Sequence, residues 1–245
     1  MDTIGKEFME KTKYHHLDLS GQMKGMKEPS LELEYDTTKT LIHLPSPQEI
    51  NVKDVPIKDA IESRVSVREY SKKSLQLIEL SYLLWCTQGV KEVIPHSATL
   101  RTVPSAGARH CFETFLLVNN VDGLEPGLYR YIALEHVLIA MNEDTTLSDK
   151  ITKACFNQMF IKTSAVTFMW TAVAYRMTWR YGERGYRYMH LDAGHICQNL
   201  YLSAESIACG VCAIGAFSDN DMNRLLNLDG IKQFVIYMAT VGKNK

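Results

Sequence analysis

The sequence predicts one large domain of the α/β or α+β class. Its 245 residues exceed a small domain but fit a single large one with a substantial buried core. Hydrophobic residues make up 46% and charged residues 22%, as in ordinary globular proteins. Stretches with helical spacing alternate with short runs of β-branched and aromatic residues, so helices and strands should be interleaved.

Residues 1–50 are polar and interrupted by prolines, which predicts an extended N-terminal arm that wraps around a single folded domain at 51–245. The N-terminus is charged throughout and lacks the apolar core of a signal peptide. No run approaches the roughly 20 apolar residues of a membrane helix. From these two observations we expect a cytoplasmic protein. Because 28 acidic and 27 basic residues nearly cancel, we expect no nucleic-acid or membrane partner.

The first part of the domain contains two predicted helices. Ile57, Ala60 and Ile61 have helical spacing, and the short helix they indicate ends at about Arg64. A second helix covers 75–88, with Ser74 as its N-cap and Gly89 as its stop.

The middle of the chain reads mainly as strands. We expect a strand at 112–118, a hairpin formed by 127–132 and 136–140, a helix at 146–155, and a central buried strand at 164–173.

The longest predicted helix runs from Tyr186 to Cys209 and ends at Gly210. It is apolar on more than one face, which indicates a subunit interface as readily as a core. A strand at 211–217, a helix at 218–228 capped by Ser218 with Asp221 three residues on, and a strand at 233–242 complete the chain.

The segment "SRVSVREY" places Arg64, Ser66 and Arg68 on one side of an extended chain. Two guanidinium groups and a hydroxyl suit a phosphate or another dianion. An exposed edge strand of alternating polarity explains the same pattern. The small-residue turns "PSAGA" (104–108) and "AIGAF" (213–217) would let a flat ring approach the backbone, whereas neither GxGxxG nor a P-loop occurs.

Other polar and sulfur-containing features have more ordinary explanations. Cys209 and Cys212 form a single CxxC in an apolar context, so we expect buried structural thiols. His195 and Asn199 lack a third ligand at metal spacing, and no metal site is predicted. The segment 176–188 interleaves four arginines with aromatic residues. We interpret it as a substrate-side loop, with a solvated linker or an RNA-binding stretch as alternatives.

In this order, "SRVSVREY", "RTVPSAGARHCFE", "GLYRY", "RYGERGYRYMHLDAGHICQNLYLSAE" and "CAIGAFSDNDMNRLLNL" resemble the FMN-dependent nitroreductase superfamily, and most closely its SagB-type dehydrogenases. The resemblance implies an α+β fold, a mixed β-sheet flanked by helices, in an intertwined homodimer with two FMN sites at the interface. NADH or NADPH would be a donor, and a small organic molecule the acceptor.

The resemblance also implies residue roles. Arg64, Ser66 and, near the C-terminus, Lys243 would hold the FMN phosphate, and Arg68 would face the N1/O2 edge of the ring. The ring would be lined by Pro104, Ser105, Ala106 and Gly107. Gly215 and Ala216 would present backbone N–H groups to O4 or N5 of the ring.

The resemblance leaves the catalytic residue unassigned and points to Arg109, Arg180 and Tyr181 as substrate-side groups. Ala108 stands where many nitroreductases have asparagine. Arg180 and Tyr181 stand where azoline dehydrogenases have a Lys-Tyr pair, and arginine is a poor general base. The expected function is FMN-dependent hydride transfer through flavin N5. The alternative is a flavin-binding protein or a non-catalytic subunit of a peptide-modifying complex.

Overall fold

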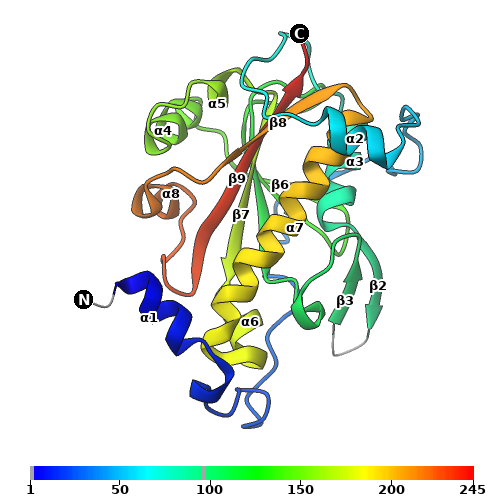
Figure 1. Ribbon diagram of the computed structural model, residues 1–245. Coiled ribbons are helices and arrows are strands. Elements are labelled where there is room, and N and C mark those ends of the chain that lie inside the picture. Colours follow the sequence, from blue (N-terminus) through cyan, green and yellow to red (C-terminus); the bar gives the residue numbers. More distant parts are fainter. Residues whose placement is uncertain (1–2, 95–97) are drawn as a thin grey trace.

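A computed structural model describes residues 3–94 and 98–245. Its centre is a seven-stranded sheet, whose arrangement Figure 1 shows. Neighbouring strands are antiparallel throughout this sheet. Their order is β1 (Leu41–His43), β6 (Val137–Asn142), β5 (Gly127–Ile132), β4 (Phe112–Val118), β7 (Val166–Val173), β9 (Gln233–Lys243) and β8 (Cys209–Ile214). A separate ribbon pairs β2 (Val90–Ile94) with β3 (Ala98–Arg101).

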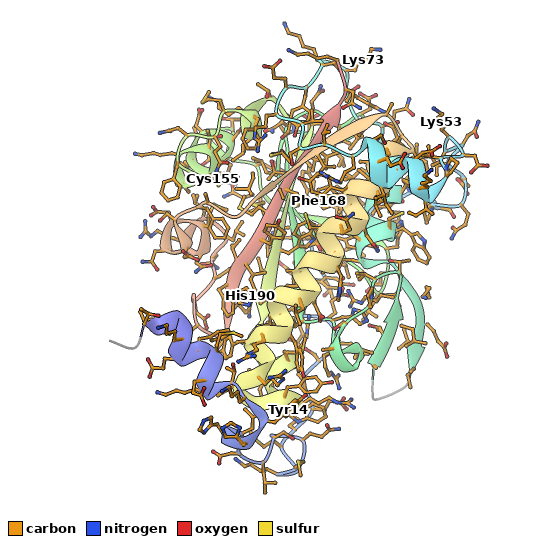
Figure 2. All side chains as sticks on the ribbon, in the orientation of Figure 1. Tyr14, Lys53, Lys73, Cys155, Phe168 and His190 are labelled. Carbon is orange, nitrogen blue, oxygen red and sulfur yellow. The ribbon has the colours of Figure 1, made fainter. Side chains whose placement is uncertain are left out.

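Helices cover both faces of the sheet, because side chains alternate between the faces along each strand. Leu116 and Phe168 belong to the core shared with α3 (Leu77–Gln88), α6 (Ala174–Tyr181) and α7 (Gly185–Glu205). Leu117 and Met169 belong to the opposite core. That core contains residues of α4 (Leu147–Ala154), α5 (Phe160–Thr163) and α8 (Asp219–Leu225). Figure 2 shows Phe168 behind α7 and Cys155 on the side of α4.

Most predicted elements are confirmed. The strand at 112–118, the hairpin, the central strand and the α4 and α8 segments form where the patterns placed them. The short helix α2 (Ile57–Ser63) ends just before Arg64. Parallel pairing among the described residues is confined to isolated bridges, Ser66 with Val211 at the edge of β8 and Leu75 with Val121.

Several predictions of local structure are wrong. The strand expected at 211–217 is β8, which begins at Cys209 and ends at Ile214. Helix α3 is capped by Gln76, which forms a capping box with Glu79, and not by Ser74. Helix α7 ends at Glu205, because Cys209 already pairs with Lys243 as the first residue of β8. The segment 176–188 is helical, with α6, a short 3₁₀ turn η3 (Gly182–Arg184) and the start of α7, so it is neither a loop nor a linker.

The predicted arm is partly helical and follows the body of the molecule. It contains α1 (Ile4–Lys11) and the 3₁₀ turn η1 (Tyr14–His16); residues 1–2 lie outside the described residues. Tyr14 lies beside the lower end of α7 in Figure 2, where its hydroxyl and that of Tyr188 are 2.6 Å apart. Arg184 donates to the Thr12 carbonyl at 3.0 Å, and Arg187 also contacts Thr12.

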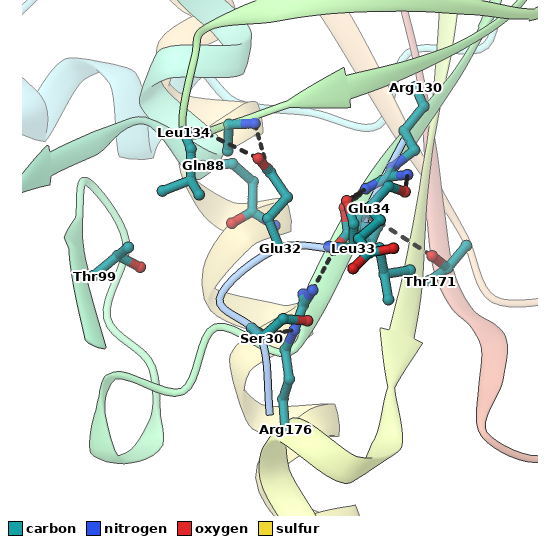
Figure 3. A network of polar contacts seen from close by, with 12 residues as sticks. Ser30, Glu32, Leu33, Glu34, Gln88, Thr99, Arg130, Leu134, Thr171 and Arg176 are labelled. Carbon is teal, nitrogen blue, oxygen red and sulfur yellow. Dashed lines mark hydrogen bonds and ion pairs between the residues drawn. The ribbon is translucent and has the colours of Figure 1, made fainter. Parts of the chain in front are cut away.

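Further along the arm, residues 30–34 cross a buried charge network (Figure 3). The Glu113 carboxylate, 3% exposed, accepts from Arg176 at 2.6 Å, from Arg130 at 3.0 Å and from the Leu33 backbone at 3.0 Å. Arg176 and Arg130 in turn donate to arm carbonyls, Arg176 to that of Ser30 at 2.8 Å. The arm therefore completes the hydrogen bonds of buried charges and does not merely cover them.

The cysteines in the described residues are free thiols, as predicted. Cys209 and Cys212 are buried, and burial raises the pKa of both thiols, that of Cys209 to about 12. Among the described residues, no helix combines the length and apolar character that a membrane span requires.

Candidate functional site

The first group of predicted site residues meets at the open edge of β8. The Val67 backbone N–H donates to the Val211 carbonyl at 2.9 Å, which fixes the segment beside the strand. The Ser66 hydroxyl is 3.0 Å from the Tyr201 hydroxyl, and that hydroxyl accepts from the Ala213 backbone at 2.9 Å. Tyr201 on α7 thus joins the "SRVSVREY" and "AIGAF" motifs.

The guanidinium of Arg64 lies over the Tyr201 ring, 5.3 Å from its centroid. Arg64 is half-buried and Arg68 is exposed. No described carboxylate forms an ion pair with either of them, in contrast to the four paired cations Arg109, Arg130, Arg176 and Lys243. A positive edge without its own counter-charge can accept an anion from solution.

Beyond β8 the backbone opens toward solvent at Gly215 and Ala216, which are exposed. A Cβ added at Gly215 would meet no described heavy atom within 4 Å. Gln158 donates to the Ala216 carbonyl at 2.9 Å and holds this peptide in place. A flat ring can therefore approach this stretch of backbone closely.

The second group forms a turn that ends in the 3₁₀ segment η2 (Ala106–Ala108). The Asp192 carboxylate on α7 holds this turn, accepting from the Ser105 hydroxyl at 2.6 Å and from the Ala106 backbone at 3.2 Å. Burial raises the pKa of Asp192, while these donors oppose the shift. Together with the 2.9 Å bond from the His110 backbone to Ser105, they give the turn one conformation.

The turn also meets the two predicted substrate-side residues of α6. Gly107 has φ +58°, and a Cβ there would collide with the Tyr181 hydroxyl and press on Arg180 at 3.2 Å. Glycine is thus required both by the backbone angle and by the close approach. The "PSAGA" turn and the Arg180–Tyr181 pair are therefore neighbours in the fold.

Arg109 and Lys243 lie away from the open surfaces of these two groups. Arg109 is buried, donates to Glu28 of the arm at 3.2 Å and stacks on Trp179. Lys243 pairs with Glu79 and donates to the Ile207 carbonyl at 3.0 Å. Its ammonium lies next to the edge of β8, but Glu79 already compensates its charge.

Within one chain the two groups lie on opposite sides of α7. Asp192 and Tyr201 are nine residues apart, which is about two and a half turns and about 14 Å of helix. Such a spacing points their side chains in opposite directions. The sequence could not reveal this separation, because the motifs are read along the chain whereas the helix passes between them.

Sequence reasoning missed Asp192 and Tyr201, the residues that hold the two groups. Both are buried, Asp192 at 3% and Tyr201 at 8% exposure. An acidic residue within the apolar surface of a long helix was the available signal for Asp192, since such residues are rarely buried without partners. Nothing in the local sequence distinguishes Tyr201 from the other tyrosines of α7.

These features define the class of protein, which is an α+β domain of the nitroreductase type. Its cationic motif lies at a sheet edge, and its small-residue motifs lie at that edge and on a turn. The nitroreductase family model matches residues 61–243. The chain therefore belongs to the nitroreductase family, a family of oxidoreductases.

Individual relatives agree with this assignment. A Methanocaldococcus jannaschii protein named as a nitroreductase is 37% identical over 202 residues, or 82% of this chain and 96% of its own length. A crystal structure described as a nitroreductase from Anabaena variabilis superposes with a TM-score of 0.74 and 26% identity, covering 98% of this chain. This chain spans only 47% of that longer one.

A second curated relative carries a different name. The trifolitoxin-processing protein of Rhizobium leguminosarum bv. trifolii is 30% identical over 133 residues. The match covers 53% of this chain and 36% of that protein. The likeness is therefore partial, and the processing of trifolitoxin that the name describes is a statement about the Rhizobium protein.

Proposed function

We propose that this protein is an FMN-dependent oxidoreductase that transfers hydride between a nicotinamide or other donor and a small organic acceptor. The observation that carries the proposal is the edge of β8. There Arg64, Ser66, Tyr201 and Ala213 form one connected group, beside exposed backbone at Gly215. A half-buried cation with a hydroxyl neighbour and no described acid partner matches the phosphate of FMN.

The residues present fit this cofactor. Arg64 and Ser66 would hold the phosphate, and Arg68 would stabilise negative charge at the N1/O2 edge of the ring. The backbone at Gly215 and Ala216 would donate near O4 or N5. When bound, FMN supplies the two-electron chemistry at N5, so the protein needs no nucleophile of its own.

The turn at 104–107 completes the site only if a second copy of the chain contributes it. One flavin cannot contact both sides of α7 in the same chain. In a dimer that pairs the two α7 helices, the β8 edge of one copy can lie beside the 104–107 turn of the other. Exposed apolar residues occur on and beside this helix, as a subunit contact requires: Leu191, Ile57, Ile61 and Val65 are 56–63% exposed. We therefore propose a homodimer with Pro104, Ser105, Ala106 and Gly107 lining the partner's flavin.

Lys243 has a reduced role in this proposal. Because its pairing with Glu79 compensates its charge, Lys243 would add neither a direct bond nor much positive field at the phosphate. Arg109 supports the turn from behind through Trp179 and the arm, while Arg180 and Tyr181 remain the substrate-side candidates.

The test uses Arg64→Ala and, as the matched control, Arg224→Ala, which removes an exposed arginine on α8. Loss of a charge-assisted bond should weaken FMN binding by about 1.5–3 kcal/mol, measured by flavin fluorescence titration. The control should bind as the wild type does. A wild-type protein that takes up no FMN would overturn the proposal.

The partial likeness to the trifolitoxin-processing protein favours one alternative, a flavin-binding subunit of a peptide-modifying complex. Both functions require bound flavin, so only turnover separates them. Stopped-flow reduction by NADH or NADPH, followed by reoxidation with quinones, nitroaromatics or azoline peptides, distinguishes them. Flavin that is bound but neither reduced by these donors nor reoxidised by these acceptors supports the alternative.

A further inference from the structure

A hollow of about 430 Å³ lies next to the turn at 104–108, and no role has been given above to most of the residues that line it. Its walls come from the β2–β3 ribbon and from the chain that leads into β4. Pro104, Ser105 and Ala108 line it on one side, and Lys91, Arg101, Thr102 and His110 are among the residues on the others. No aspartate or glutamate is among the described residues of this lining.

Arg101 is exceptional among the buried arginines of the described chain. Four arginines are at most 6% exposed, and three of them pair with a carboxylate: Arg109 with Glu28, and Arg130 and Arg176 with Glu113. Arg101, at 6%, forms no ion pair with any described residue. A buried charge normally has a partner, since removing it from water is costly.

The hydrogen bonds of Arg101 leave one group available. Its Nε donates to the Thr99 hydroxyl at 3.1 Å and its Nη1 to Gln88 at 3.1 Å, whereas no described residue accepts from Nη2. Glu32 and Glu113 favour its charge only at longer range, and burial still lowers its pKa. Glu32 itself accepts from the Ala133 backbone at 2.6 Å.

The remaining walls of the hollow agree with an anionic occupant. Lys91, which also lines the hollow, is exposed and forms no ion pair within the described chain, so its charge is available to a ligand. Burial and the nearby Arg101 and Arg109 charges lower the pKa of His110 to about 3, which keeps this imidazole neutral. The hydroxyl groups of Ser105 and Thr102 add polar contacts beside the cations.

We propose that this hollow binds a carboxylate of the organic substrate, with Arg101 and Lys91 supplying the positive charge. The inference rests on the proposed function, because it places the substrate beside the ring-lining turn. It assigns a substrate class: acceptors that carry a carboxylate should be preferred over neutral acceptors of the same shape.

The experiment compares benzoate with benzamide, two probes of similar shape but different charge. Ligand-observed NMR titration of the wild type should give benzoate binding roughly tenfold or more tighter, as expected for a charge-assisted contact. Lys91→Gln should reduce this ratio severalfold, and Arg101→Gln should abolish it. Lys162→Gln, which removes an exposed lysine on α5, should leave the ratio unchanged.

Turnover gives a second reading with the FMN-loaded protein. The ratio of kcat/KM for 4-nitrobenzoate to that for 4-nitrobenzamide should exceed one in the wild type and fall toward one in Lys91→Gln. Equal binding of benzoate and benzamide, or a preference that persists in Lys91→Gln, would overturn the inference even if Arg101→Gln does not fold. If FMN binds and is reduced while no charge preference exists, this inference fails and the proposed function stands.

Discussion

Two sites with buried arginines lie near each other in this molecule, one centred on Glu113 and one on Arg101. They differ in whether a carboxylate accepts hydrogen bonds from the arginine. Around Glu113, Arg130 and Arg176 have both a carboxylate and arm carbonyls as partners. Among the described residues, Arg101 donates only to neutral oxygen atoms, those of the Thr99 and Gln88 side chains. Buried arginine side chains therefore stabilise the fold at the Glu113 site, whereas the one at the Arg101 site is available to a ligand.

The largest expected loss of stability is at the Glu113 site, where each buried charge has a partner. Glu113→Gln should lower the free energy of unfolding by about 3–5 kcal/mol, because two buried guanidinium groups lose their only described counter-charge. Urea denaturation followed by circular dichroism measures this. The control Glu7→Gln breaks an exposed pair with Lys11 and should leave the free energy of unfolding essentially unchanged, because water and salt screen such a pair. Similar losses in both variants would contradict the distinction drawn here.

Glu32 lies between the two sites and makes the comparison depend on pH. Burial and the Glu113 charge raise its pKa to about 7, so the folded state holds a proton that the unfolded state releases above about 4.5. Its contribution is fully present below pH 4.5 and is lost as pH rises through 7.

Glu32→Gln should therefore stabilise the protein at pH 8 by about 1–2 kcal/mol, after allowance for partial exposure, and have little effect near pH 5. Thermal unfolding from pH 5 to pH 8 tests this. The neighbouring Glu34→Gln, at an exposed position, serves as the control. An equal effect of Glu32→Gln at both pH values would refute the assignment of the raised pKa.

The sequence was most informative where a pattern is local. Runs of β-branched and aromatic residues indicated β4 and β7. The helical spacing of Ile57, Ala60 and Ile61 placed the "SRVSVREY" motif after a helix, and α2 does end at Ser63. The Glu113 site could not be predicted, since its members come from the arm, β4, β5 and α6. The division of the candidate site by α7 also depends on tertiary packing, and Tyr201 and Asp192 were missed for that reason.

The smallest expected change in the free energy of unfolding among these substitutions is at Arg101, and it gives the sharpest contrast with the Glu113 site. Arg101→Met replaces an uncompensated buried cation with an apolar side chain of similar length. The lost bonds to Thr99 and Gln88 should be offset by the relieved desolvation, leaving the free energy of unfolding within about 1 kcal/mol of the wild type. The matched Arg130→Met variant leaves part of the Glu113 charge unpaired and should lose several times more. If both substitutions destabilise the protein equally in urea denaturation, Arg101 is a structural residue like the others, and the hollow beside it has no need of an anion.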